Sequence, residues 1–150
     1  MTIINDYDRT ETFLRSKLLG AQLDTFQVYS SVLQIDFFVG FMPGRSGSCW
    51  LSTLDNISIS SDAALFNDRR TVIAELYDLI GQDIKDVKIE SNGSLVLSIG
   101  GKVLTASLDE DSVEDESWSV TPDSPDIYAE HEWLVALAEG PELVLRLPPI

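Results

Sequence analysis

The chain has 150 residues, of which 44% are hydrophobic, and it carries 25 acidic against 10 basic side chains for a net charge of −15 at pH 7. That apolar content excludes an acidic disordered chain, and that charge excludes nucleic-acid binding as a default function, because nucleic-acid binders obtain most of their affinity from lysine and arginine at phosphates. The length predicts a single domain over 1–150, with one well-buried core.

The N-terminus and the rarest residues bear on the compartment. The first residues lack the basic region and apolar core of a signal peptide, and no apolar run approaches the roughly 20 residues that cross a bilayer. Cys49 is the only cysteine and His131 the only histidine, so neither an internal disulfide nor a histidine-based metal site can form. We therefore expect a cytoplasmic protein, and the sequence predicts no cofactor and no metal site.

Two segments are predicted to be amphipathic helices, one over about 10–19 and one over about 68–80. In each, apolar side chains recur three or four positions apart, a polar residue can cap the start, and a glycine follows the last apolar position. The candidate N-caps and closing glycines are Asp8 or Thr10 with Gly20, and Asn67 or Asp68 with Gly81.

Alternating apolar and polar residues predict three strands in the first half, over about 23–29, 32–42 and 48–60. The segment 43–47 between the last two is predicted to be a hairpin loop. It is rich in glycine and contains Arg45, but a phosphate-binding loop leads directly into a helix, and this segment leads into a strand.

Glycines set the strand register in the second half. Gly100 and Gly101 predict a two-residue hairpin turn, and a three-residue loop over 91–93, with Gly93 left-handed, keeps the apolar side chains on one face. The predicted cross-strand pairs are Leu97 with Leu104, Leu95 with Ala106, Ile89 with Leu95 and Val87 with Leu97. A short strand at Trp118 and a terminal hairpin over 132–148 complete an α+β fold, mostly antiparallel β, with about nine or ten strands and two helices.

The two halves resemble each other in part. The segments 18–28 and 79–89 have apolar residues at the same positions, 61 residues apart, each around a glycine. A duplicated α-β-β-β unit, covering about 8–66 and 67–121, would explain this match. The alternative is that any passage from a helix through a glycine to a strand shows the same pattern.

Acidic residues are concentrated near the C-terminus. Between Val103 and Leu145 the chain has twelve carboxylates and no lysine or arginine. Such a one-signed block repels nucleic acid and anionic membranes and attracts cationic proteins. A calcium loop is disfavoured within 109–116, because the run has no central glycine and is flanked by strands rather than helices. A solvated connection and a protein-docking surface remain as interpretations.

His131 and Cys49 are weaker candidates for chemistry. His131 lies between two glutamates and could act as an acid or base, but an exposed strand residue is the simpler interpretation. Cys49 has no basic neighbour in sequence, which favours a small buried apolar residue over a reactive thiol.

About half the chain resembles a loose group of small acidic bacterial proteins. The resemblance runs from Leu79-Ile80-Gly81, through the glycine-marked strands and Glu116-Ser117-Trp118, to the terminal hairpin. Those proteins are immunity proteins of polymorphic-toxin and contact-dependent growth-inhibition systems. The resemblance implies an immunity protein that binds a toxin nuclease or similar effector in the cytoplasm and blocks it.

The charge pattern points independently to an inhibitory binding protein with no catalytic residues. Toxins that act on nucleic acid have basic grooves, which an acidic surface can occupy. The expected partner contacts are Asp109, Glu110, Asp111, Glu114, Asp115, Glu116 and Trp118. Two alternatives stay open: a structural or adaptor β domain that self-associates through sheet edges, and an enzyme that uses paired carboxylates with a divalent metal.

Overall fold

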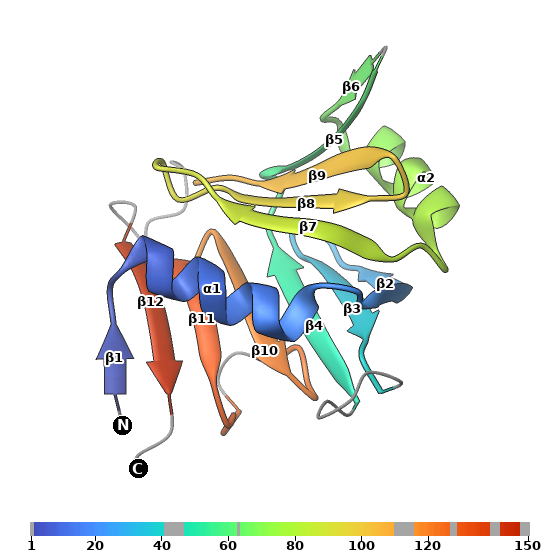
Figure 1. The fold of residues 1–150 in the computed structure, drawn as a ribbon. Coiled ribbons are helices and arrows are strands. Elements are labelled where there is room, and N and C mark those ends of the chain that lie inside the picture. Colours follow the sequence, from blue (N-terminus) through green and yellow to red (C-terminus); the bar gives the residue numbers. More distant parts are fainter. Residues whose placement is uncertain are drawn as a thin grey trace.

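The structure, a computed structural model, describes residues 2–40, 47–62, 64–109, 116–126, 129–138 and 142–147 (Figure 1). Within these residues the chain forms two helices and twelve strands, and the strands make two antiparallel sheets. The prediction of an α+β fold dominated by antiparallel sheet is confirmed. The strand count exceeds the predicted nine or ten, since two short strands were not predicted and one predicted strand is divided.

The elements are arranged as follows. The seven-stranded sheet has the order β1 (Thr2–Ile4), β12 (Glu142–Leu147), β11 (Leu134–Ala138), β10 (Trp118–Pro122), β4 (Ser48–Thr53), β3 (Leu33–Phe38) and β2 (Gln22–Val28). The five-stranded sheet has the order β6 (Ala64–Phe66), β5 (Ile57–Ser61), β9 (Lys102–Ala106), β8 (Leu95–Ile99) and β7 (Ile84–Ile89). The helices are α1 (Tyr7–Leu18) and α2 (Arg69–Leu79).

Aspartates cap both helices. Asp68 caps α2, as predicted, and its side chain accepts a hydrogen bond from the backbone N–H of Thr71. Hydrogen bonds from the Thr71 side chain and backbone lower the pKa of Asp68 below its usual value. The predicted cap of α1 is wrong: the helix begins earlier, with Asp6 as its N-cap. Thr10 lies inside the helix, where its hydroxyl donates to the Asp6 carbonyl at 2.7 Å.

The segment 48–60, predicted as one strand, forms two strands in different sheets. β4 belongs to the seven-stranded sheet and β5 to the five-stranded sheet. Asn56 holds the connection between them: its carboxamide accepts from Leu54 N at 2.9 Å and donates to the Ser107 carbonyl and, at 2.8 Å, to the Ser117 carbonyl. The chain therefore crosses between the sheets at a residue whose side chain provides the missing backbone partners.

The predicted register of the second half is confirmed. Leu97 pairs with Leu104 across the Gly100-Gly101 turn, and Val87 pairs with Leu97 across the preceding loop. The bond from Glu90 N to the Ser94 carbonyl closes that loop around three residues. Gly93 has a φ of 89°, as the three-residue loop requires.

The structure also repeats a supersecondary unit: each helix is followed by three antiparallel strands, β2–β4 after α1 and β7–β9 after α2. Gly20 N donates to the Ile84 carbonyl and Gly81 N donates to the Leu23 carbonyl, both at 2.8 Å. Exchanging each residue for its counterpart 61 positions away converts one bond into the other. The ladder irregularities after Leu23 and after Ile84 also correspond. This symmetry supports the duplicated-unit interpretation.

Helix α1 covers the edge strand β7. The Arg15 guanidinium donates to the Val87 carbonyl at 2.8 Å and to the Asp86 carboxylate, which lowers the pKa of Asp86. Glu11 accepts from Ile89 N at 2.8 Å. The side chains of α1 thus satisfy backbone groups of an edge that could otherwise recruit another strand.

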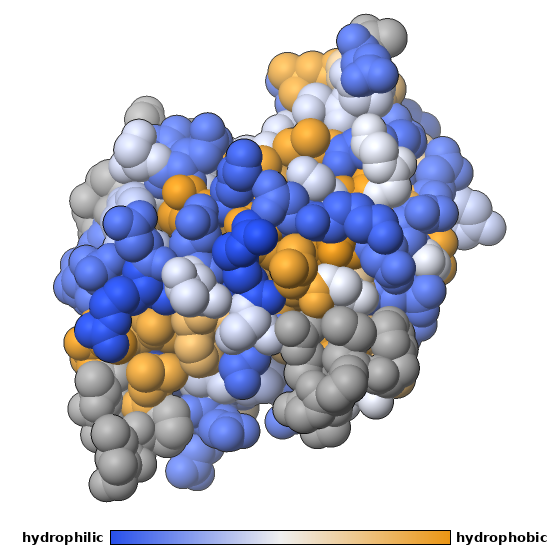
Figure 2. All heavy atoms as spheres, viewed as in Figure 1, coloured by the Kyte–Doolittle hydropathy of each residue, from blue (hydrophilic) through white to orange (hydrophobic). Residues whose placement is uncertain are grey.

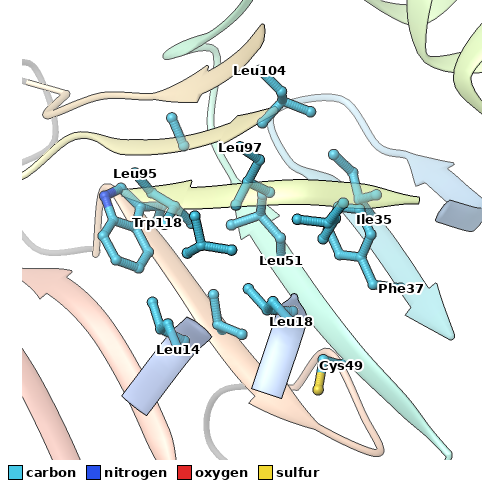
Figure 3. Packing of buried hydrophobic residues seen from close by; sticks show 14 of the residues in the cluster. Leu14, Leu18, Ile35, Phe37, Cys49, Leu51, Leu95, Leu97, Leu104 and Trp118 are labelled. Atoms are coloured by element: carbon cyan, nitrogen blue, oxygen red, sulfur yellow. The ribbon is translucent and has the colours of Figure 1, made fainter. Parts of the chain in front are cut away.

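One hydrophobic core joins the sheets and both helices. Figure 3 shows side chains from the two sheets meeting those of α1. The labelled members are Leu95, Leu97 and Leu104 from the five-stranded sheet, Ile35, Phe37, Cys49, Leu51 and Trp118 from the seven-stranded sheet, and Leu14 and Leu18 from α1. Val72, Leu76 and Leu79 of α2 belong to the same cluster.

Candidate functional site

The structure divides the described carboxylates of the acidic block between two ends of the seven-stranded sheet. Strands β10, β11 and β12 are antiparallel neighbours, so successive connections lie at opposite ends. β10 alone, at five residues, separates those ends by about 17 Å. One group comprises Asp109, Glu116 and Glu142; the other comprises Asp123, Asp126, Glu130 and Glu132.

Hydrogen bonds and strand pairing bring the first group together. Asp109 N donates to the Ser117 hydroxyl at 2.9 Å, and Ser117 N donates to the Leu137 carbonyl at 2.9 Å. Ala138, the next residue, pairs with Glu142 across the terminal hairpin. Both stems of the segment 110–115 therefore adjoin the β11–β12 hairpin.

A fourth carboxylate, Glu90, joins this group from the β7–β8 loop. The buried Trp118 indole N–H donates to the Gly93 carbonyl at 3.0 Å, which places that loop beside the start of β10. We name Glu90, Asp109, Glu116 and Glu142 the acidic end. In Figure 1 the β7–β8 loop and the starts of β12 and α1 lie together at the upper left, and in Figure 2 hydrophilic atoms cover the start of α1 there.

The acidic end is partly open to solvent and presents four carboxylates. Glu90 and Glu142 are exposed, and Asp109 and Glu116 are half-buried. The described cation nearest to Glu90 in sequence is Lys88, whose Nζ lies 3.8 Å from Asp86 Oδ2. Four carboxylates from three separate segments thus share one surface, where their fields add.

The predicted contact residues have different outcomes. Asp109 and Glu116 lie at the acidic end, whereas Glu110, Asp111, Glu114 and Asp115 lie outside the described residues. The prediction for Trp118 does not fit its burial: the side chain is 0% exposed, in the core. Its indole N–H holds the β7–β8 loop next to β10, and the side chain cannot itself touch a partner in this conformation.

The prediction that His131 is an exposed strand residue is wrong. His131 is half-buried in the connection between β10 and β11. Its Nδ1 lies 3.1 Å from the Pro122 carbonyl oxygen and its Nε2 lies 2.5 Å from the Asp126 carbonyl oxygen. Both ring nitrogens therefore face backbone carbonyl oxygens at the start of this connection. His131 thus has a structural role in holding the connection between β10 and β11.

Cys49 is buried in the core, with 4% exposure, as its sequence context indicated. The centre of the glycine-rich loop, residues 41–46, lies outside the described residues, and Gly47 and Ser48 lead into β4 rather than into a helix. A phosphate-loop geometry therefore has no support in the described part of this segment.

Asp36 of β3 is a buried carboxylate on the other face of the sheet from Ile35 and Phe37. It is 7% exposed, and its Oδ1 has no hydrogen-bond partner. Burial raises the pKa of Asp36, a hydrogen bond with Ser48 partly opposes this, and the negative charge of Asp24 raises the pKa further.

Replacing Asp36 with asparagine is expected to raise the free energy of unfolding, relative to the wild type, by more at neutral pH than at acidic pH. Because the folded-state pKa of Asp36 is raised, the folded protein holds a proton there that the unfolded chain releases. The contribution of Asp36 to stability therefore falls as pH rises from the unfolded value near 3.8 through the folded pKa. D36N removes this loss. Denaturant unfolding of both proteins at about pH 3 and pH 7 checks it, and a difference in unfolding free energy that is the same at both values would contradict it.

In the described parts of the chain, no three histidine, cysteine, aspartate or glutamate side chains are placed so that they could hold a metal ion. No helix within those parts is long and apolar enough to cross a membrane. Comparisons with protein-family models, curated proteins and solved structures found no match.

Proposed function

We propose that this protein is an immunity protein, which binds a basic, nuclease-type toxin domain in the cytoplasm through its acidic end and blocks it. The observation that carries the proposal is the gathering of Glu90, Asp109, Glu116 and Glu142 on one surface from three separate segments. The resemblance of the C-terminal half to small acidic immunity proteins points the same way.

Inhibition of this kind needs no catalytic chemistry. A nuclease presents a basic groove to its phosphate substrate, and an acidic surface can dock in or beside that groove. Complementary charge steers the two proteins together and raises the association rate 10-fold to 1,000-fold at low salt. Rapid capture suits an inhibitor that must act before the toxin reaches nucleic acid.

The acidic end and the carboxylates at the opposite end of strands β10–β12 provide a matched test. The variant E90Q/D109N/E116Q/E142Q neutralises the acidic end, and D123N/D126N/E130Q/E132Q removes the same number of charges from the other end. Each variant should be measured against the effector domain encoded beside the gene. We expect the first to slow association roughly 10-fold to 100-fold at low salt and to lose protection of cells that express the effector. The second should retain most of both.

Equal losses in the two variants would mean that net charge, rather than the acidic end, controls binding. No association of the wild-type protein with the effector at any salt concentration would overturn the proposal. Circular dichroism of each variant serves as the folding control.

Self-association is the second candidate function, and edge strand β2 favours it. Beyond the contacts of Gln22 and Leu23 with residues 81–83, β2 has a free edge in the described structure, and Val28 and Tyr29 at its end are 46% and 52% exposed. Exposed apolar residues on an open edge permit pairing with another strand. Sedimentation over a concentration series tests this: a mass that grows with concentration and falls back in V28K supports it.

A further inference from the structure

A cavity of about 250 Å³ lies between α2, β3, β5 and the β4–β5 connection. Leu33, Ile57, Val72 and Ile73 provide apolar walls, and Arg69 and Asp55 provide charged groups. Leu33, Ile57 and Val72 are buried, at 5%, 6% and 1% exposure. These elements are distinct from those that build the acidic end, and the proposed function makes no use of them.

The Arg69 guanidinium is only partly satisfied. Nη1 donates to the Ser30 carbonyl at 2.6 Å and lies 3.6 Å from Asp55 Oδ1, which is too far for a hydrogen bond. Nη2 is enclosed and has no hydrogen-bond partner. A charged donor without an acceptor is unfavourable. Because Nη2 has almost no accessible surface, a ligand in the cavity that Arg69 lines would meet this donor once the guanidinium turns toward it.

We propose that this cavity binds a small apolar monocarboxylate, with the carboxylate against Arg69 and the apolar body between α2, β3 and β5. Guanidinium donors match carboxylate oxygens in geometry and charge. The volume is below the roughly 300–1,000 Å³ of pockets that hold drug-sized ligands, so one aromatic ring or a short alkyl chain fits. A phosphate would leave several charged oxygens against Leu33 and Val72, and a cation would face the guanidinium.

The test uses phenylacetate as the probe and phenylacetamide as its uncharged counterpart, in about 0.15 M salt, followed by amide chemical shifts of the full chain. We expect phenylacetate to bind with a dissociation constant on the order of 1 mM, as a ligand of this size allows, and to shift Leu33, Val72 and Ile73. Phenylacetamide should bind at least 10-fold more weakly.

Variants distinguish the contact of the Arg69 guanidinium with the ligand from the effect of the protein's overall charge on binding. R69M should weaken phenylacetate binding at least 10-fold, and R70M, which removes the same charge from an exposed neighbour that does not line the cavity, should not. D55N should strengthen binding several-fold, because it removes a competing carboxylate from the rim. If R69M does not fold, I73W, which fills the cavity and keeps Arg69, replaces it and should abolish binding.

Three results would overturn the assignment. They are no phenylacetate shifts at about 10 mM, equal binding of the acid and the amide, or equal losses in R69M and R70M.

Discussion

Replacing Trp118 with alanine is expected to lower the free energy of unfolding by about 3–5 kcal/mol, the usual range for a large aromatic residue removed from a core. The side chain is fully buried, and its indole N–H is bonded to the Gly93 carbonyl at 3.0 Å. That bond joins β10 of one sheet to the β7–β8 loop of the other. The variant therefore leaves a cavity and an unpaired carbonyl where the sheets meet.

Trp118→Phe separates these two contributions, because phenylalanine keeps most of the buried ring and lacks the N–H. We expect it to lose about 1 kcal/mol for the hydrogen bond and a further part for the smaller ring. Urea unfolding of the wild type and both variants measures the differences. A loss below about 1.5 kcal/mol in W118A would show that Trp118 is not a core residue.

Trp118 also shows where sequence reasoning failed at the site. Its position two residues after Glu116, in an exposed acidic context, suggested a surface aromatic. Its alternation with Val120 placed both side chains on one face, and the structure shows that this face is buried, at 0% exposure for each. All five residues of β10 are buried, so the central place of this strand in the seven-stranded sheet, and not the charge of its neighbours in sequence, decides the burial of Trp118.

The local fold was predictable wherever a turn left a specific chemical signature. Gly93, Gly100 and Gly101 all have positive φ, and the register derived from them is correct. The division of 48–60 was missed because side-chain parity does not change across it. Leu51 and Thr53 of β4 and Ile57 and Ile59 of β5 are all buried, so the odd positions point inward in both sheets.

Three-residue strands and contacts between residues far apart in the chain could not be predicted, because a single sequence carries too little pattern to indicate them. β1 and β6 are shorter than the window in which alternation can be recognised. The acidic end includes Glu90, which contacts of the β7–β8 loop with Trp118 and Leu137 bring to the C-terminal acids. The carboxylates between Val103 and Leu145 are close in sequence, which suggested one acidic surface. The antiparallel order of β10–β12 instead places the described ones at two ends of the sheet.

Replacing Gly93 with alanine is expected to cost about 2–5 kcal/mol, and the same change at Gly81 only about 1–2 kcal/mol. Both glycines have nearly the same backbone strain, with φ values of 89° and 90°. A Cβ at Gly81 meets no atom within 4 Å, whereas one at Gly93 would lie 2.5 Å from Leu137 Cδ1. Leu137 is 0% exposed, so its side chain cannot swing aside without disturbing the core.

Gly81→Ala is thus the matched control, because it carries the cost of positive φ without the steric overlap. In the double variant Gly93→Ala with Leu137→Ala, the overlap disappears, so the combined loss should fall short of the sum of the single losses by about 1 kcal/mol or more. Urea unfolding of the four variants and the wild type gives this coupling. Equal costs at Gly93 and Gly81, with additive losses in the double variant, would mean that the β7–β8 loop does not pack against β11. The acidic end would then lose one of the two contacts that bring Glu90 to it, and the bond between Trp118 and Gly93 would remain.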